Sequence, residues 1–261
     1  MNPDHPSQLG RPDLNGYLAV LASEAKELAT AAGEAGLDAQ VPTCPGWTIN
    51  DLVLHLGEVH RWATAVVASE ATRLGDVPAD SLGPLPGHAD TIDWFCRGAV
   101  ALRDCLAEAD PTVEYAAFLT DPRSPRLLFW ARRQTLETSV HRVDAESAVG
   151  RCTPLAPDIA LDGIDEFLTG FIPRSRTPLR ADTPHCLQFA PTYSDHRWTV
   201  SISKELPETV RRATDADCIV SGPASDIYLA LWNRGSLDKL DITGDRTAID
   251  MLRANVHIRW G

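Results

Sequence analysis

The segment RRQTLETSVHRVDAE, residues 132–146, carries side chains of the kinds that bind metal ions. We expect it to be helical, and at about 100° per residue Glu137, His141 and Asp144 fall within about 60° of one another on one side. Residues at positions i and i+4 can direct a carboxylate oxygen and an imidazole nitrogen at one ion. A polar stripe of this kind is more often the solvated face of a surface helix. The segment alone leaves both interpretations open.

A second segment, DLVLHLGEVH at residues 51–60, offers a third ligand. His55 lies among leucines, so we expect its side chain to face the interior of a helical bundle. A single histidine there is more often a hydrogen-bonded core residue, although four-helix bundles also build ion sites from inward-facing side chains. Two histidines and one glutamate suit catalytic zinc, with a fourth position left for water, substrate or a thiol. His60 lies about 140° from His55 around the helix and is a poor candidate.

Three further charged residues could support such a site. Asp51 lies one turn before His55 and could orient its imidazole, but it also stands three residues after Thr48 in a capping-box pattern. Asp144 could orient a ligand, take a proton or pair with Arg133, and the first of these roles is favoured. Both roles of Asp51 remain open.

The first half of the chain shows the periodicity of four helices of about twenty residues each, which is typical of a bundle. Their expected ranges are Leu14–Ala35, Thr48–Ser69, Asp90 or Thr91 to Ala109, and Arg126–Val149.

The pattern changes after Gly150, where a helical patch at 161–171 is followed by short strands near 186–190, 198–203, 217–220 and 240–243. We expect helices at 224–234 and 245–254 between and after these strands. The chain is therefore predicted to be an α+β two-domain protein. Residues 13–150 would form a four-helix metal-binding bundle, and residues 151–261 a small α+β domain with a mixed or antiparallel sheet.

The composition excludes several classes of partner. Acidic residues number 36 and basic residues 24, and the net charge of −12 disfavours nucleic acid and anionic membranes. The six cysteines form no C-x-x-C pair, and the start MNPDHPSQLG shows no signal peptide. No apolar run approaches the roughly 20 residues needed to span a bilayer. We expect a soluble, cytoplasmic protein with reduced thiols, monomeric or weakly dimeric.

Three motifs resemble a known family. CPGWTINDLVLHL at 44–56, WARRQTLETSVHRVDAE at 130–146 and GPASDIYLALWNRG at 222–235 are similar in kind and order to the mycothiol-dependent maleylpyruvate isomerase family. This resemblance implies a DinB-like metal-binding domain followed by a domain of sterol-carrier-protein type. One departure is Leu136, since many members have histidine before the metal-binding glutamate.

Carried over to this sequence, the resemblance implies that His55, Glu137 and His141 bind zinc or another divalent metal ion. It also implies that Arg234 contacts an anionic substrate or the thiol. Arg234 could instead stabilise the C-terminal end of its helix, because a positive charge there interacts favourably with the helix dipole. Asp144, Arg133 and Asp51 would then lie around the ligands.

The implied function is that of a zinc-dependent, mycothiol-using enzyme acting on an electrophilic small molecule. A thiol bound to zinc loses its proton near neutral pH and can add to a conjugated double bond. Either cis–trans isomerisation or S-transfer can follow, and the sequence does not separate them. Two alternatives remain: a non-catalytic, metal-braced binding module for a small molecule or protein, and a biosynthetic tailoring metalloenzyme that no longer uses the thiol.

Overall fold

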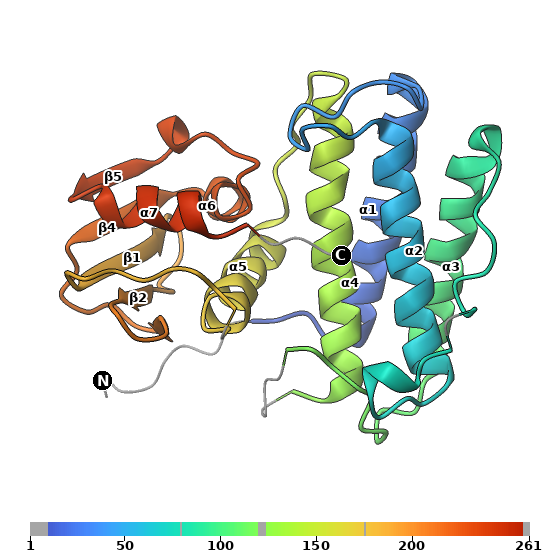
Figure 1. The fold of residues 1–261 in the computed structure, drawn as a ribbon, viewed down its shortest axis with the longest axis horizontal. Coiled ribbons are helices and arrows are strands. Elements are labelled where there is room, and N and C mark those ends of the chain that lie inside the picture. The colour runs from blue at the N-terminus through green and yellow to red at the C-terminus, as the bar shows by residue number, and fades with distance from the viewer. Residues whose placement is uncertain (1–9, 79, 120–123, 175, 258–261) are drawn as a thin grey trace. The chain divides into compact units, whose positions relative to one another are not determined.

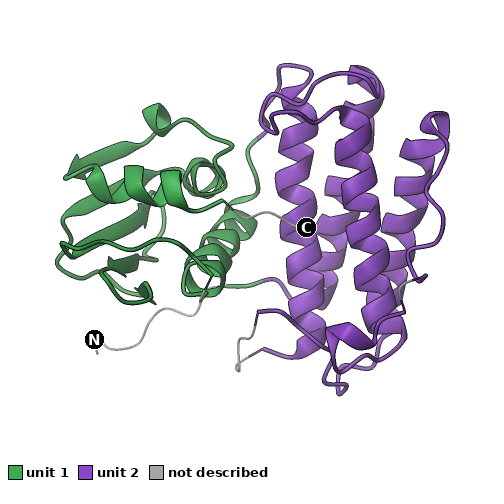
Figure 2. Ribbon diagram, in the orientation of Figure 1, with its two compact units in different colours: residues 1–11, 154–261 green, residues 12–153 purple. Residues whose placement is uncertain are grey.

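The described chain forms two compact units in a computed structural model (Figure 1), which describes residues 10–78, 80–119, 124–174 and 176–257. One unit comprises residues 12–153, and the other comprises residues 154–261 with the N-terminal residues up to Arg11 (Figure 2). The predicted domain limits, 13–150 for the bundle and 151–261 for the α+β domain, stay a prediction.

The first unit is a four-helix bundle, as predicted. Its helices are α1 (Leu14–Ala35), α2 (Ile49–Ala68), α3 (Thr91–Glu108) and α4 (Arg126–Ser147), joined by irregular segments that include the short 3₁₀ helices η1 (Leu74–Asp76) and η2 (His88–Asp90). Each helix boundary lies within two residues of its expected position. The capping box is also present, because the Thr48 hydroxyl accepts the Asp51 N–H while the Asp51 carboxylate accepts the Thr48 N–H.

Helices α1 and α4 run parallel to each other. The Thr135 hydroxyl donates to Tyr17 O near the start of α1, and about two turns further along both helices the Arg142 Nε donates to Glu24 at 2.8 Å. Helices α2 and α3 also run parallel. Thr91 donates to the Asn50 side chain where both helices begin, so the long segment between α2 and α3 returns along the bundle.

Helix α4 is buried on all sides, although its sequence is strongly polar. Of the sites considered above, Arg133 is 1% exposed, Glu137 4%, His141 6% and Asp144 0%. The interpretation of this segment as a solvated surface face is therefore wrong. Burial on this scale requires polar partners, and α4 finds them on other elements as well as along its own length. Arg142, for example, bonds both Glu24 and Glu146.

The second unit combines a five-stranded mixed sheet with helices, as the predicted α+β fold requires. Its elements are α5 (Pro157–Glu166), a π-helical turn η3 (Phe167–Phe171), β1 (His185–Pro191), β2 (Trp198–Ile202), β3 (Glu208–Val210), β4 (Cys218–Gly222), α6 (Ala224–Leu231), η4 (Leu237–Lys239), β5 (Asp241–Gly244) and α7 (Thr247–Asn255). The strand order is β3-β2-β1-β4-β5. Only β1 and β4 pair in parallel. The short strand β3 was not predicted.

A buried carboxylate ties the helical side of this unit to its sheet. Asp165 on α5 is 0% exposed and accepts a hydrogen bond from the Trp198 indole of β2 at 2.9 Å. Arg11 and Arg211 both donate to the same carboxylate. Two arginines and an indole thus compensate a charge that would be costly to bury alone.

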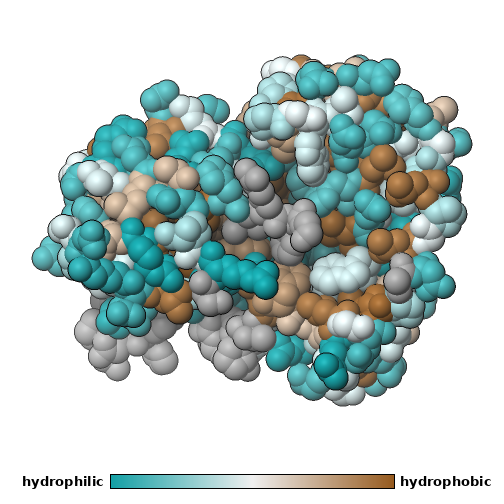
Figure 3. Space-filling model, viewed as in Figure 1, coloured by the Kyte–Doolittle hydropathy of each residue, from teal (hydrophilic) through white to brown (hydrophobic). Residues whose placement is uncertain are grey.

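The surface agrees with the acidic, polar composition. Hydrophilic and hydrophobic residues are interspersed on the face shown in Figure 3, and the exposed large hydrophobic side chains among the described residues are Leu85, Val100, Tyr193 and Leu206. Within the described part of the chain, no helix is both long and apolar enough to cross a membrane. All six cysteines are free thiols.

Candidate metal centre

The structure brings His55, Glu137 and His141 together inside the bundle. One potential ligand atom from each residue lies within 4.8 Å of the other two. Glu137 Oε1 is 3.2 Å from His141 Nε2 and 3.8 Å from His55 Nε2. Helix α4 supplies Glu137 and His141, which are one turn apart and so share a face. Helix α2, which packs against α4, supplies His55.

These distances fit a divalent metal ion. Zinc binds imidazole nitrogen and carboxylate oxygen at about 2.0–2.2 Å, so tetrahedral ligands are separated by about 3.3 Å. The Glu137–His141 separation of 3.2 Å is close to this value, and the Glu137–His55 separation of 3.8 Å is longer by about 0.5 Å. Two imidazoles and one carboxylate also match the donor set of catalytic zinc, which leaves one coordination position open, and not the Cys-rich, four-ligand set of most structural zinc sites.

The electrostatics prepare Glu137 as an anionic ligand. Burial by itself raises the pKa of this carboxyl group, but the Arg133 guanidinium, the hydrogen bond with His141 and the nearby His55 imidazole outweigh burial and hold the pKa well below its usual value. Arg133 Nη2 donates to Glu137 Oε2 at 2.6 Å. Because this contact occupies one carboxylate oxygen, the other oxygen faces the histidines.

A hydrogen-bond chain fixes the imidazole of His141. Its Nδ1 lies 2.9 Å from Asp144 Oδ2, and the Thr43 hydroxyl donates to Asp144 Oδ1 at 2.6 Å. A carboxylate that accepts from Nδ1–H leaves Nε2 as the metal-binding nitrogen. In the protein without metal, burial lowers the pKa of His141, yet the bonds with Asp144 and Glu137 raise the pKa to about 9.

A tight turn places Trp47 beside both histidines. The turn Cys44–Pro45–Gly46–Trp47 has Pro at its second position and Gly46 at φ +88°, and Trp47 N donates to Cys44 O at 3.0 Å, as in a type II turn. The Trp47 ring lies 5.1 Å from the His55 ring and is stacked 6.4 Å from the His141 ring. Its indole therefore covers one side of the centre.

Two residues near the centre were not anticipated. Nothing in the sequence distinguished Thr43 from an ordinary loop residue, because its partner Asp144 lies 101 positions later. The position of Trp47 gave a weak indication that it lies near the centre, since it directly precedes the N-cap Thr48 of the helix that carries His55. Cys44, which begins the turn before Trp47, is buried in the hydrophobic core.

Other candidates have different positions. The Asp51 carboxylate accepts hydrogen bonds from Thr48, which is the helix-capping role. Its orienting role toward His55 stays a prediction. His60 is buried but is not one of the three converging residues, and its Nε2 bonds Thr138. Arg234 belongs to the other unit, where its guanidinium donates to Trp232 O at 2.9 Å. Its contact with a substrate remains a prediction.

Two family models match the chain in sequence. The model of the mycothiol maleylpyruvate isomerase N-terminal domain matches residues 18–146, and the model of the C-terminal domain of the same proteins matches residues 158–250. The chain belongs to the mycothiol maleylpyruvate isomerase family. Each unit of this family member therefore contains one of the two matched regions. The three proposed ligands, His55, Glu137 and His141, all lie within the first match.

Solved structures show the same fold for this family member. The crystal structure of the mycothiol-dependent maleylpyruvate isomerase has 14% sequence identity with the chain and a TM-score of 0.62, covering 90% of this chain and 95% of that one. A crystal structure of a histidine-to-alanine mutant of that protein gives 13% identity with the same TM-score and coverage. No curated protein matches the chain significantly.

Proposed function

We propose that this protein is a zinc-dependent enzyme that uses mycothiol and acts on a small electrophile by cis–trans isomerisation or S-transfer. Membership of the mycothiol maleylpyruvate isomerase family supports a thiol-dependent isomerase in general terms. The observation that supports a metal site is the convergence of two imidazole nitrogens and one carboxylate oxygen within 4.8 Å of one another.

In this proposal each residue of the centre has a separate task. His55, Glu137 and His141 hold the ion, Arg133 keeps Glu137 ionised and oriented, and Asp144 keeps the His141 proton on Nδ1. When bound, zinc supplies a Lewis acid that lowers the pKa of a coordinated thiol, so that thiolate is present at neutral pH. Burial of the centre favours this because electrostatic interactions strengthen where water is excluded.

The substrate would be a molecule with a cis double bond conjugated to a carbonyl group. That double bond becomes a single bond when the carbon–sulfur bond forms, and it can then rotate. The trans double bond forms again when the carbon–sulfur bond breaks and the thiol leaves. If instead the enolate left by the addition takes up a proton from solvent and the adduct is released, the reaction is S-transfer. Arg234 is proposed to bind the anionic group of such a substrate, because a guanidinium pairs well with a carboxylate.

Metal analysis of the purified protein tests the first half of this proposal. We expect one zinc ion or another divalent ion per chain in the wild type and a large loss in His55→Ala. Ser139→Ala is a matched control, because this buried α4 hydroxyl bonds only Thr135 O among the described residues and should leave the metal content unchanged. Less than a tenth of an ion per chain in wild-type protein grown with zinc would contradict the proposal.

Thiol binding and turnover test the second half. With Co²⁺ replacing zinc, mycothiol should produce a thiolate-to-metal absorption band, and maleylpyruvate and other electrophiles should turn over only when mycothiol is present. His55→Ala should abolish both signals while the protein stays folded. A variant that binds no metal and unfolds would indicate a metal-braced module. Turnover without any thiol would indicate a tailoring enzyme.

A further inference from the structure

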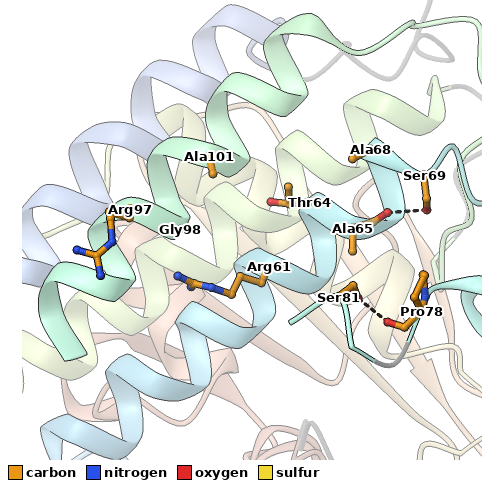
Figure 4. A pocket seen from close by; sticks show the side chains of 10 residues that line it. All are labelled: Arg61, Thr64, Ala65, Ala68, Ser69, Pro78, Ser81, Arg97, Gly98 and Ala101. Carbon is orange, nitrogen blue, oxygen red and sulfur yellow. Dashed lines mark hydrogen bonds between the residues drawn. The ribbon is translucent and has the colours of Figure 1, made fainter. Parts of the chain in front are cut away.

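A pocket of about 560 Å³ lies on the first unit between α2, α3 and the segment that joins them (Figure 4). Helix α2 contributes Arg61 and Ala65, helix α3 contributes Arg97 and Ala101, and Ser81 comes from the joining segment. This volume is within the range of about 300–1,000 Å³ that is usual for small-molecule sites.

The pocket is separate from the candidate metal centre. Arg61 and Thr64 follow His55 on α2 by six and nine residues, so they project about 120° and 180° away from it around the helix. The residues that line the pocket include none of the three proposed metal ligands. A ligand in this pocket would therefore contact a different side of α2.

Arg61 is held firmly at one end of the pocket. Its guanidinium lies 3.5 Å from the centre of the Trp94 ring and donates to Gly57 O at 3.0 Å and to Trp94 O at 2.8 Å. Gly98 makes room for it, since a Cβ at that position would lie 2.5 Å from Arg61 Nη1. A guanidinium has five N–H donors, so those not used in these two bonds remain for a ligand.

A second arginine adds positive charge at the same end. Arg97 precedes Gly98, is exposed, and makes no hydrogen bond or ion pair with any residue that the structure describes. Burial, and then the like charge of Arg97, lower the pKa of Arg61, as expected for two neighbouring cations. None of the described residues that line the pocket is acidic, although the chain carries a net charge of −12.

The opposite end of the pocket is only weakly polar. Figure 4 shows Ser69 and Ser81 there, and their hydroxyl groups already donate to Ala65 O and Pro78 O. Alanine side chains form much of the remaining wall. This end therefore offers methyl groups and satisfied hydroxyls, which suit an uncharged and compact part of a ligand.

We propose that this pocket binds a small organic anion, a carboxylate or a phosphate monoester with a compact apolar body. The anionic group lies between the guanidinium groups of Arg61 and Arg97, which match carboxylate and phosphate oxygens in geometry. The apolar body packs on the alanines of α2 and α3. An anion there also relieves the repulsion between the two arginines.

Titrations followed by amide NMR shifts test this site with four probes. Phenyl phosphate and benzoate combine an anion with an apolar ring, inorganic phosphate has only the charge, and benzyl alcohol has only the ring. We expect saturable shifts of α2 and α3 residues with phenyl phosphate or benzoate, and affinities for the other two probes that are at least about tenfold weaker. The comparison of phenyl phosphate with benzoate shows which anion the site prefers.

Three variants locate the binding. Arg97→Gln should weaken it about five- to tenfold, since one exposed charge-assisted contact is lost. Arg103→Gln is the matched control on α3, because Arg103 pairs with Asp104 and does not line the pocket. Ala101→Phe places a ring in the pocket at an exposed position and should abolish saturable binding while the protein stays folded.

His55→Ala separates the pocket from the metal centre. Binding with unchanged affinity in this variant is expected. The proposal is wrong if neither anionic probe saturates, if benzyl alcohol binds as well as they do, if Arg97→Gln and Arg103→Gln behave alike, or if His55→Ala abolishes binding.

Discussion

At the scale of single residues, the candidate centre depends on groups that fix the ligands as well as on the ligands themselves. Arg133 holds one oxygen of Glu137 at 2.6 Å, and Asp144 holds His141 at 2.9 Å. Both supporting residues are buried, so neither contact is screened strongly by water. Metal affinity should therefore respond to changes in residues that do not touch the ion.

Asp144→Asn tests the support of His141. An amide is a weaker acceptor for the Nδ1–H and carries no charge, so we expect metal affinity to fall about 10- to 100-fold with the ligands intact. Competition with a chelator of known affinity gives the value. Thr43→Val should have a smaller effect in the same direction, and Thr43→Ser should preserve the affinity. Equal affinities in all these variants would show that Asp144 does not orient His141.

The pKa of His141 predicts how metal affinity depends on pH. Without metal this pKa is raised to about 9, so the imidazole must lose a proton before it binds the ion. We expect affinity to rise as pH increases from about 7 to 9, and close to one proton to be released per ion at pH 7. Titration calorimetry in buffers of different ionisation enthalpy measures this number.

The same group affects the stability of the protein without metal. Because its folded pKa of about 9 exceeds the ordinary value of 6.5, its stabilising contribution is complete below pH 6.5 and is lost as pH rises through 9. In His141→Gln this part of the pH dependence should disappear from thermal melts. A wild-type melting temperature that rises between pH 6.5 and 9 without metal would disagree with this sign.

At the scale of elements, the centre needs α2 to be held close against its neighbours. Gly57 allows α3 to approach, because a Cβ at this position would lie 2.1 Å from the Trp94 ring. The helix boundaries could be predicted from local signals such as the Thr48 capping box. The close approach of α3 to Gly57 could not be predicted from such signals. From the sequence, a glycine inside a helix indicates only a lower helix propensity. The packing reason for Gly57 became clear only when the structure placed Trp94 against it.

Gly57→Ala tests this approach. We expect the free energy of unfolding to fall by about 1–3 kcal/mol, because overpacking outweighs the gain in helix propensity. Gly33→Ala is the control within α1, since nothing lies within 4 Å of its added Cβ. That variant should be stabilised by about 0.5–1 kcal/mol. Urea denaturation measures both, and a stabilised Gly57→Ala would contradict the packing.

At the scale of the whole molecule, the proposed metal ligands and Arg234 belong to different units. Metal binding and substrate binding should therefore respond separately to mutation. Arg234→Gln is expected to leave metal content unchanged and to lower kcat/KM for an anionic electrophile about 10- to 100-fold, by removing a charge-assisted contact. Arg234→Lys should recover part of this loss. Unchanged kinetics in Arg234→Gln would leave Arg234 with only a structural role at the end of α6.

The sequence by itself determined the helices of the bundle, most strands and the alignment of Glu137 with His141, because these depend on residues close together in the chain. It did not determine whether that polar stripe faces water or the interior. Only the tertiary structure decided this, because the stripe is contacted by residues such as His55 and Thr43, which are far from α4 in the sequence. Local periodicity shows which side chains share a face, and packing between elements decides what that face meets.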